Sequence, residues 1–214
     1  MPAIIETTVY RLDELPEAAK DSARAWYRAG ALDDDWHDAV YEDFQRVAEI
    51  LGIRLRTRAV RLMGGGTRHE PCIWFTGFWS QGDGAAWEGW YEFRKGAVAD
   101  IRAHAPQNGD LHRIADSLLA VQRRNFYQLQ AGVRHCGRYY HAFTMEIDVT
   151  RDSPTAQEAT EDAETIVTEA LRDLARWLYR QLERECEYLS FDAALDEAIV
   201  LNGYTFTVEG WRLG

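Results

Sequence analysis

The sequence predicts an α+β fold, with helices packed on one face of an antiparallel sheet of hairpins and a long acidic helix near the C-terminus. In several long segments apolar residues recur at three- and four-residue spacing, the period of a helix with one buried face. Shorter aromatic-rich segments have a period of two and are separated by glycine-containing turns, as in antiparallel strands. A length of 214 residues with 46% apolar composition suits a single domain over 1–214, with a weak boundary near 150–156.

The N-terminal half is expected to hold two helices and several strands. Pro16 with its acidic neighbours favours the start of the first helix, and Gly30 favours its end. Apolar residues spaced three and four apart predict the second helix, and Gly52 ends it. The expected elements are a strand at 3–10, helices at 15–29 and 36–51, a strand from residue 53, a loop at 63–70, and a hairpin with strands 72–79 and 87–94.

The C-terminal half is expected to alternate between a hairpin and helices. The elements are a helix at 111–129, a hairpin with strands 133–136 and 139–149, helices at 158–188 and 191–201, and a short strand at 204–208. Six aromatic residues that lie on the apolar side of their elements are expected to be largely buried. They are Trp26, Trp36, Phe44, Phe75, Trp90 and Trp177.

The charge and cysteine content exclude several classes of protein. Lys and Arg number 24 and Asp and Glu 35, so the net charge is −11, which argues against direct binding of nucleic acid or anionic membranes. No apolar run reaches the roughly 18 residues of a membrane span, and no signal pattern begins the chain. Cys72, Cys136 and Cys186 are irregularly spaced, which argues against disulfides and a zinc site. We therefore expect a cytoplasmic protein without a cofactor.

Asp83 lies between two glycines in the most unusual segment of the chain, at residues 74–90. With Glu88 it could hold a divalent cation or share acid–base work, which would make the protein a metal-dependent hydrolase. Alternatively, Asp83 bonds its own backbone in a tight loop and the tryptophans fill the core. His135, Cys136 and His141 lie on two arms of one hairpin, where they are either structural residues or a metal or Cys–His site.

Charged residues are unevenly distributed along the chain. Arg54, Arg56, Arg58 and Arg61 could bind phosphate or carboxylate groups, or pair with acidic helices nearby. Between residues 152 and 197 there are 13 acids and four arginines, a net charge of −9. This stretch could imitate nucleic acid toward a basic partner, although duplex DNA carries one charge per about 1.7 Å, a several-fold higher density. The alternative is a solvated helix face with ion pairs such as Glu169–Arg172 and Asp173–Arg176.

Six segments occur in the same order as in a known family. They are residues 12–27, 40–43, 74–89 with the core 80–85, 111–115, 137–139 and 177–183. Through them the chain resembles a family of uncharacterised bacteriophage and prophage proteins that are often labelled "antitoxin of toxin–antitoxin stability system". The resemblance implies a phage accessory protein made in the bacterial cytoplasm, and it carries over no catalytic residues.

A non-enzymatic binding protein is the leading expectation. By analogy with other small acidic phage proteins, it would inhibit a host defence complex, as an anti-CRISPR does, through contact with a basic surface on a protein or nucleoprotein. The alternatives are an antitoxin that binds its toxin and the metal-dependent hydrolase. The oligomeric state is left open. The residues expected to contact the partner are Asp33, Asp34, Asp35, Asp83, Glu161, Asp162 and Glu164.

Overall fold

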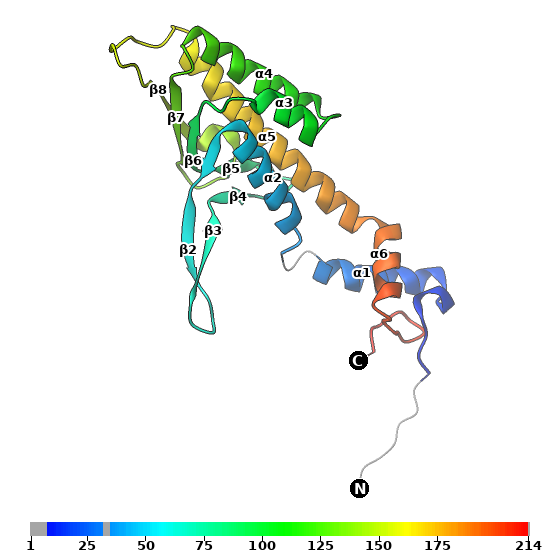
Figure 1. Cartoon of the computed structure of the whole chain (residues 1–214). Helices are drawn as coiled ribbons and strands as arrows, with labels where there is room; N and C mark the ends of the chain where they lie inside the picture. Colours follow the sequence, from blue (N-terminus) through cyan, green and yellow to red (C-terminus); the bar gives the residue numbers. More distant parts are fainter. Residues whose placement is uncertain (1–7, 32–34, 214) are drawn as a thin grey trace. The chain divides into compact units, whose positions relative to one another are not determined.

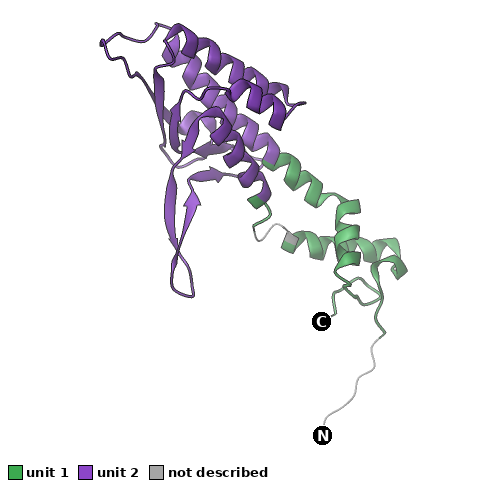
Figure 2. Cartoon of the chain, viewed as in Figure 1, with its two compact units in different colours: residues 1–38, 182–214 green, residues 39–181 purple. Residues whose placement is uncertain are grey.

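The structure, a computed structural model, describes residues 8–31 and 35–213 and has the α+β fold that the sequence predicts (Figure 1). The chain forms two compact units, coloured in Figure 2. Unit 1 comprises residues 1–38 and 182–214, and unit 2 comprises residues 39–181. One boundary therefore lies inside helix α5 (Ala163–Ser190), whereas the stretch 150–156 lies within unit 2.

Unit 1 is formed by the two ends of the chain, which pack against each other. Helix α1 (Glu17–Ala31) packs on α6 (Asp192–Leu201), and the 3-10 helix η1 (Leu12–Glu14) also contacts α6. Phe206 forms isolated β-bridges with Tyr10 and Arg212 where the sequence predicts strands at 204–208 and 3–10, and residues 3–7 lie outside the described part. The buried residues of this small core are Leu12, Leu15, Ala19, Ala23, Ile199 and Phe206.

A bidentate ion pair fastens α1 to α6 within unit 1. Arg24 donates from Nε to Asp196 Oδ1 at 2.7 Å and from Nη2 to Oδ2 at 2.8 Å. The Arg24 side chain is 11% exposed, so the pair lies in a poorly solvated setting and holds its geometry. Arg24 also lowers the pKa of the Asp196 carboxyl, as expected for a carboxylate stabilised by a guanidinium.

The central sheet of unit 2 is antiparallel and has the order β1 (Ile53–Leu55), β6 (Gly89–Glu92), β7 (Leu129–His135), β8 (Met145–Arg151). Leu129, Ala131 and Val133 are buried on one face, and Figure 1 shows α4 (Gly109–Arg124) and α5 on that side. Trp90 is on the opposite face, across from Gly132, and is 53% exposed. The expected burial of Trp90 is therefore wrong.

The core of unit 2 connects helices to a strand of a hairpin. Phe44 of α2 (Asp38–Leu51) stacks on Trp177 of α5 with ring centroids 6.4 Å apart, and it also contacts Trp87 of β5 (Ala85–Trp87) at 6.3 Å. Phe44 and Trp177 are buried as expected, whereas Trp26, Trp36 and Phe75 are only partly buried. All described helices are too short or too polar to cross a lipid bilayer.

Several elements differ from the sequence-based expectation. Residues 67–71, expected in a loop, form β3 (Thr67–Pro71), which pairs with β2 (Thr57–Arg61). The strand expected at 72–79 is β4 (Ile73–Phe75) and pairs with β5, while β6 joins the central sheet. Helix α3 (Ala97–His104) has no counterpart in the sequence analysis. The strand expected from 139 begins at Met145, after the 3-10 helix η2 (Ala142–Thr144).

Candidate functional site

Of the acidic residues near the start of α5, Asp162 is half-buried and paired, whereas two others are exposed. Asp162 accepts a hydrogen bond from Arg124 Nη1 at 2.7 Å, and this bond lowers the pKa of its carboxyl. Glu161 and Glu164 are exposed. Asp35 is exposed as well, whereas Asp33 and Asp34 lie outside the described residues.

Farther along α5 the ion pairs between neighbouring turns are confirmed. Arg172 binds Glu169 at 3.3 Å, and Arg176 binds Asp173 at 2.6 Å. Arg113 of α4 also binds Asp173, so this carboxylate has two cationic partners that lower its pKa against the raising effect of burial. The middle of α5 is thus an ion-pair network with little unbalanced negative charge.

The net negative charge belongs almost entirely to unit 1. That unit contains 16 Asp and Glu against six Lys and Arg, a net charge of −10, whereas unit 2 contains 19 against 18, a net charge of −1. Glu187, Glu197 and Glu209 of unit 1 are exposed. Large apolar side chains of the same unit are also exposed, namely Tyr188, Phe191, Val200, Leu201 and Trp211. Aromatic side chains are enriched in protein–protein interfaces, and polar and charged groups surround them at the rim.

Asp83 bonds its own loop, as the second interpretation of this motif expects, but the tryptophans of the segment do not all fill the core, since Trp87 is buried whereas Trp79 and Trp90 are exposed. Its Oδ2 atom accepts hydrogen bonds from the backbone N–H groups of Trp79 at 3.0 Å and Ser80 at 2.7 Å. Glu88 instead accepts from the His135 backbone N–H at 3.1 Å and pairs with Arg56 at 3.0 Å. Among the described residues, no three His, Cys, Asp or Glu side chains are grouped so that they could hold a metal ion. The geometry therefore gives the metal-dependent hydrolase no support.

A cavity of about 580 Å³ lies beside the Asp83 loop. We call it the Asp83 cavity. Its polar lining comes from the loop at Gln81 and Asp83, from His141, and from Arg176, Tyr179 and Arg180 of α5, while Gly84, Ala85, Ala142, Phe143 and Ala175 supply apolar surface. The volume is in the range of small-molecule sites, and the combination of an apolar floor with a few convergent polar groups is typical of them.

Gly84 permits the close approach of the two loops that line the Asp83 cavity. A Cβ atom on Gly84 would lie 2.6 Å from the His141 Cβ and 2.9 Å from its Cα, closer than non-bonded atoms can approach. We therefore expect Gly84→Ala to lower the free energy of unfolding by about 1–3 kcal/mol, as overpacking does. Urea unfolding would measure the loss. Gly82→Ala is less informative, because Gly82 has a positive φ of 100° and an alanine there would be strained whatever surrounds it. Gly109→Ala is the control, since no atom lies within 4 Å of the added Cβ, and an equal loss there would contradict the explanation.

The arginine cluster on the first strands pairs with nearby strands rather than with acidic helices. Arg54 lies 3.7 Å from Glu92 of β6, and Arg58 lies 3.2 Å from Glu70 of β3. His135 is also structural, because its ring bonds the Tyr139 carbonyl at 3.0 Å and contacts the Tyr140 ring. A hydrogen bond with Glu146 raises the pKa of the Cys136 thiol, and the nearby Arg134 offsets only part of this rise. A Cys–His nucleophile is therefore unsupported.

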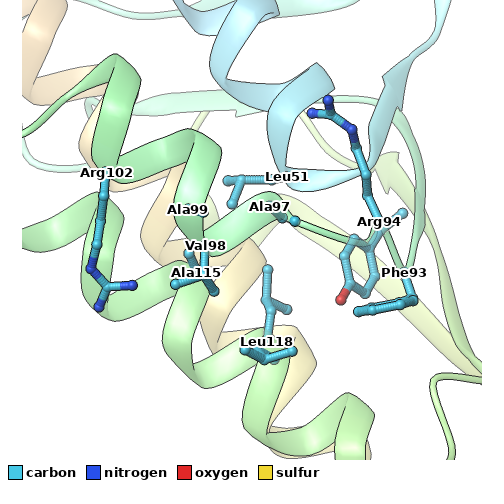
Figure 3. Close-up of a pocket in the computed structure, with 12 residues that line it drawn as sticks. Leu51, Phe93, Arg94, Ala97, Val98, Ala99, Arg102, Ala115 and Leu118 are labelled. Atoms are coloured by element: carbon cyan, nitrogen blue, oxygen red, sulfur yellow. The ribbon is translucent and has the colours of Figure 1, made fainter.

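A second hollow, of about 390 Å³, lies between α3, α4 and the end of β6 (Figure 3). Leu51, Ala97, Ala115 and Leu118 line it with apolar atoms. Figure 3 shows the charged end groups of Arg94 and Arg102 directed away from each other, at opposite sides of the view. Tyr91 also lines the hollow, but its hydroxyl already accepts a hydrogen bond from Gln122, so few polar groups are available there to orient a ligand.

Comparison with known proteins identifies the family of the chain. No curated protein and no solved structure is significantly similar to the chain. The model of a domain of unknown function, DUF8835, matches residues 36–192, which include the whole Asp83 cavity and all of unit 2. The chain therefore belongs to the DUF8835 family.

Proposed function

We propose that the protein is a non-enzymatic binding protein of phage origin that inhibits a host defence complex by direct contact. The observation that carries the proposal is the net charge of −10 on unit 1, against −1 on unit 2. A defence complex that handles nucleic acid needs a basic surface, and an acidic protein can occupy that surface. The resemblance to phage and prophage proteins supports the phage origin, and through it a cytoplasmic location.

Unit 1 combines the two contributions that a protein contact needs. Its carboxylates would accelerate the encounter with a basic surface, because charge complementarity acts mainly on the association rate. Its exposed aromatic side chains, Tyr188, Phe191 and Trp211, would then be desolvated in the complex and supply affinity. The residues that the sequence predicts to contact the partner are Asp33–Asp35, Asp83 and the acids at the start of α5. The charge distribution favours a contact through unit 1. Of the predicted contact residues, Asp33–Asp35 belong to unit 1, whereas the others belong to unit 2, namely Asp83, Glu161, Asp162 and Glu164.

Two matched charge reversals test this assignment. Glu187, Glu197 and Glu209 of unit 1 are exchanged for lysine together, and the control exchanges Asp148, Glu161 and Glu164 of unit 2, which are also exposed. Both variants change the net charge by the same amount and should keep the wild-type stability within about 0.5 kcal/mol per site. We expect the unit 1 variant to lose its partner through an association rate at least about 10-fold slower, and the control to retain it.

The measurement combines a phage assay with affinity purification. The tagged protein is expressed in a host that carries a defence system, and plaque counts report whether the defence is inhibited. Captured proteins are identified by mass spectrometry, and the association rate with the purified partner is then measured at about 0.1 M and 1 M salt, where the Debye length falls from about 10 Å to 3 Å. Loss of binding in the control but not in the unit 1 variant would contradict the assignment. Capture of a small toxin instead would favour the antitoxin function.

A further inference from the structure

The Asp83 cavity carries an inference that is independent of the proposed protein contact. We propose that it binds a small molecule with an oxyanion, either phosphate or carboxylate, at one end and a hydrogen-bond donor at the other. Arg176 and Arg180 would bind the oxyanion, and Asp83 would accept from the donor. All three side chains belong to unit 2 and line the same cavity.

The two arginines are held in place by carboxylates outside the cavity lining. Arg180 donates from Nη2 to Asp110 Oδ2 at 2.7 Å, and Arg176 donates from Nη1 to Asp173 Oδ1 at 2.6 Å. Each guanidinium has five N–H donors, so these bonds fix its position and leave other donors available to a ligand. Preorganised guanidinium groups of this kind bind phosphate and carboxylate with strong, charge-assisted hydrogen bonds.

His141 supplies a third donor at the same cavity. Its Nδ1 atom accepts a hydrogen bond from the Phe143 backbone N–H at 3.1 Å. In the neutral ring Nδ1 is therefore the acceptor, and Nε2 carries the proton. A ligand oxygen near Nε2 would thus meet an N–H group, which agrees with an anionic end of the ligand near His141 and the two arginines.

Asp83 adds a hydrogen-bond acceptor to the cavity, in contrast to the donors of the two arginines. Its Oδ2 atom is occupied by the backbone N–H groups of Trp79 and Ser80, and Oδ1 is left to accept from a ligand. Tyr179 stabilises the loop from the α5 side, because its hydroxyl donates to the Gly77 carbonyl at 2.9 Å. Since the two arginines and the Asp83 loop are held by these contacts, little ordering would be needed when the ligand binds.

Four probes test the proposal on the full-length protein: inorganic phosphate, glucose 6-phosphate, AMP and glutamate. Each is added at about 10 mM, with sodium chloride of equal ionic strength as the reference. A ligand that binds only the folded state raises the melting temperature, and we expect a rise of about 3–5 °C for at least one probe. Calorimetric titration then gives its Kd. Phosphate compounds and glutamate are separate arms, so the result also identifies which oxyanion the site prefers.

Two substitutions assign the binding to the Asp83 cavity. Arg180→Gln should weaken binding at least about 10-fold, whereas Asp110 keeps its pair with Arg113 and the fold is retained. Arg102→Gln is the matched control, because Arg102 is also a helix residue with an aspartate partner, Asp116, at 2.8 Å. Asp83→Asn should weaken the binding of glucose 6-phosphate, AMP or glutamate, which have donors away from their oxyanion, more than the binding of inorganic phosphate. Equal binding by Arg180→Gln and Arg102→Gln, or no rise in melting temperature with any probe, would overturn the proposal.

Discussion

Replacing Trp177 by alanine is expected to lower the free energy of unfolding by about 3–5 kcal/mol, a large part of a typical total of about 5–15 kcal/mol. Trp177 is only 2% exposed and stacks on Phe44 with an interplanar angle of 23°. Because Phe44 also packs against Trp87, the substitution would leave a cavity where α2, α5 and β5 meet. A second alanine at Phe44 should add less than its separate effect, since both residues line the same cavity.

Trp79→Ala is the control for this prediction. Trp79 is 86% exposed on the Asp83 loop, so its removal should change the free energy of unfolding by no more than about 0.5 kcal/mol. Urea unfolding followed by circular dichroism measures both variants without relying on tryptophan fluorescence. If Trp177→Ala and Trp79→Ala were equally stable, α5 would not belong to the core of unit 2.

Helices with a wide apolar face were predictable from the sequence. The expected helices at 15–29 and 36–51 correspond to α1 (Glu17–Ala31) and α2 (Asp38–Leu51), because each has a long periodic segment with clear end signals. Helix α3 was not predictable in this way. It has eight residues, of which only Ile101 is fully buried, so it shows too few apolar positions to define a period.

Strands were harder to predict, because their pattern depends on what covers them. β3 pairs with β2 alone and has no buried residue, so alternation is missing and the segment resembles a loop. In β6 the alternation exists, but it does not say which side faces the helices. Tyr91 faces the core and Trp90 the solvent, since a shift by one residue exchanges the two faces of a strand.

The candidate sites show the same division between local and long-range information. The bonds of Asp83 to Trp79 and Ser80 span three and four residues, and the glycine-flanked motif predicts them. The approach of Arg176 and Arg180 to Asp83 joins positions more than 90 residues apart, and no local pattern indicates it. Likewise, the net charge of unit 1 becomes visible only when both chain ends are known to fold together, as the Arg24–Asp196 pair shows.

The second large effect is expected at alkaline pH and involves Tyr91. This tyrosine is 2% exposed, and burial raises the pKa of its hydroxyl from 10 to about 12, while a hydrogen bond from Gln122 opposes part of the rise. In the unfolded chain the pKa is near 10, so between pH 10 and 12 the unfolded state loses the proton and the folded state keeps it. The stabilisation is therefore complete below pH 10 and is lost as the pH rises toward 12.

The size of this effect follows from the difference between the two pKa values. A pKa of about 12 in the folded protein against about 10 in the unfolded chain corresponds to roughly 3 kcal/mol, most of which should be lost by pH 11.5. Urea unfolding at pH 8, 10 and 11.5 would measure the decrease. Tyr91→Phe removes the ionisable hydroxyl, so its free energy of unfolding should fall less over this range, whereas the exposed Tyr139→Phe should behave like the wild type.

Gln122 links the ionisation of Tyr91 to the contact between α4 and β7. The side chain is fully buried, and its Nε2 donates to the Tyr91 hydroxyl at 3.2 Å and to the Leu129 carbonyl at 2.8 Å, while its Oε1 accepts from the Leu129 N–H at 3.1 Å. Deprotonation of Tyr91 would place a negative charge beside the hydrogen bonds by which the Gln122 side chain of α4 binds the backbone of Leu129 in β7. We therefore expect the tyrosinate absorbance that Tyr91→Phe removes to appear near pH 12 while the protein stays folded, and at lower pH only as it unfolds. If that absorbance appears near pH 10 with the fold intact, the burial of Tyr91 is wrong.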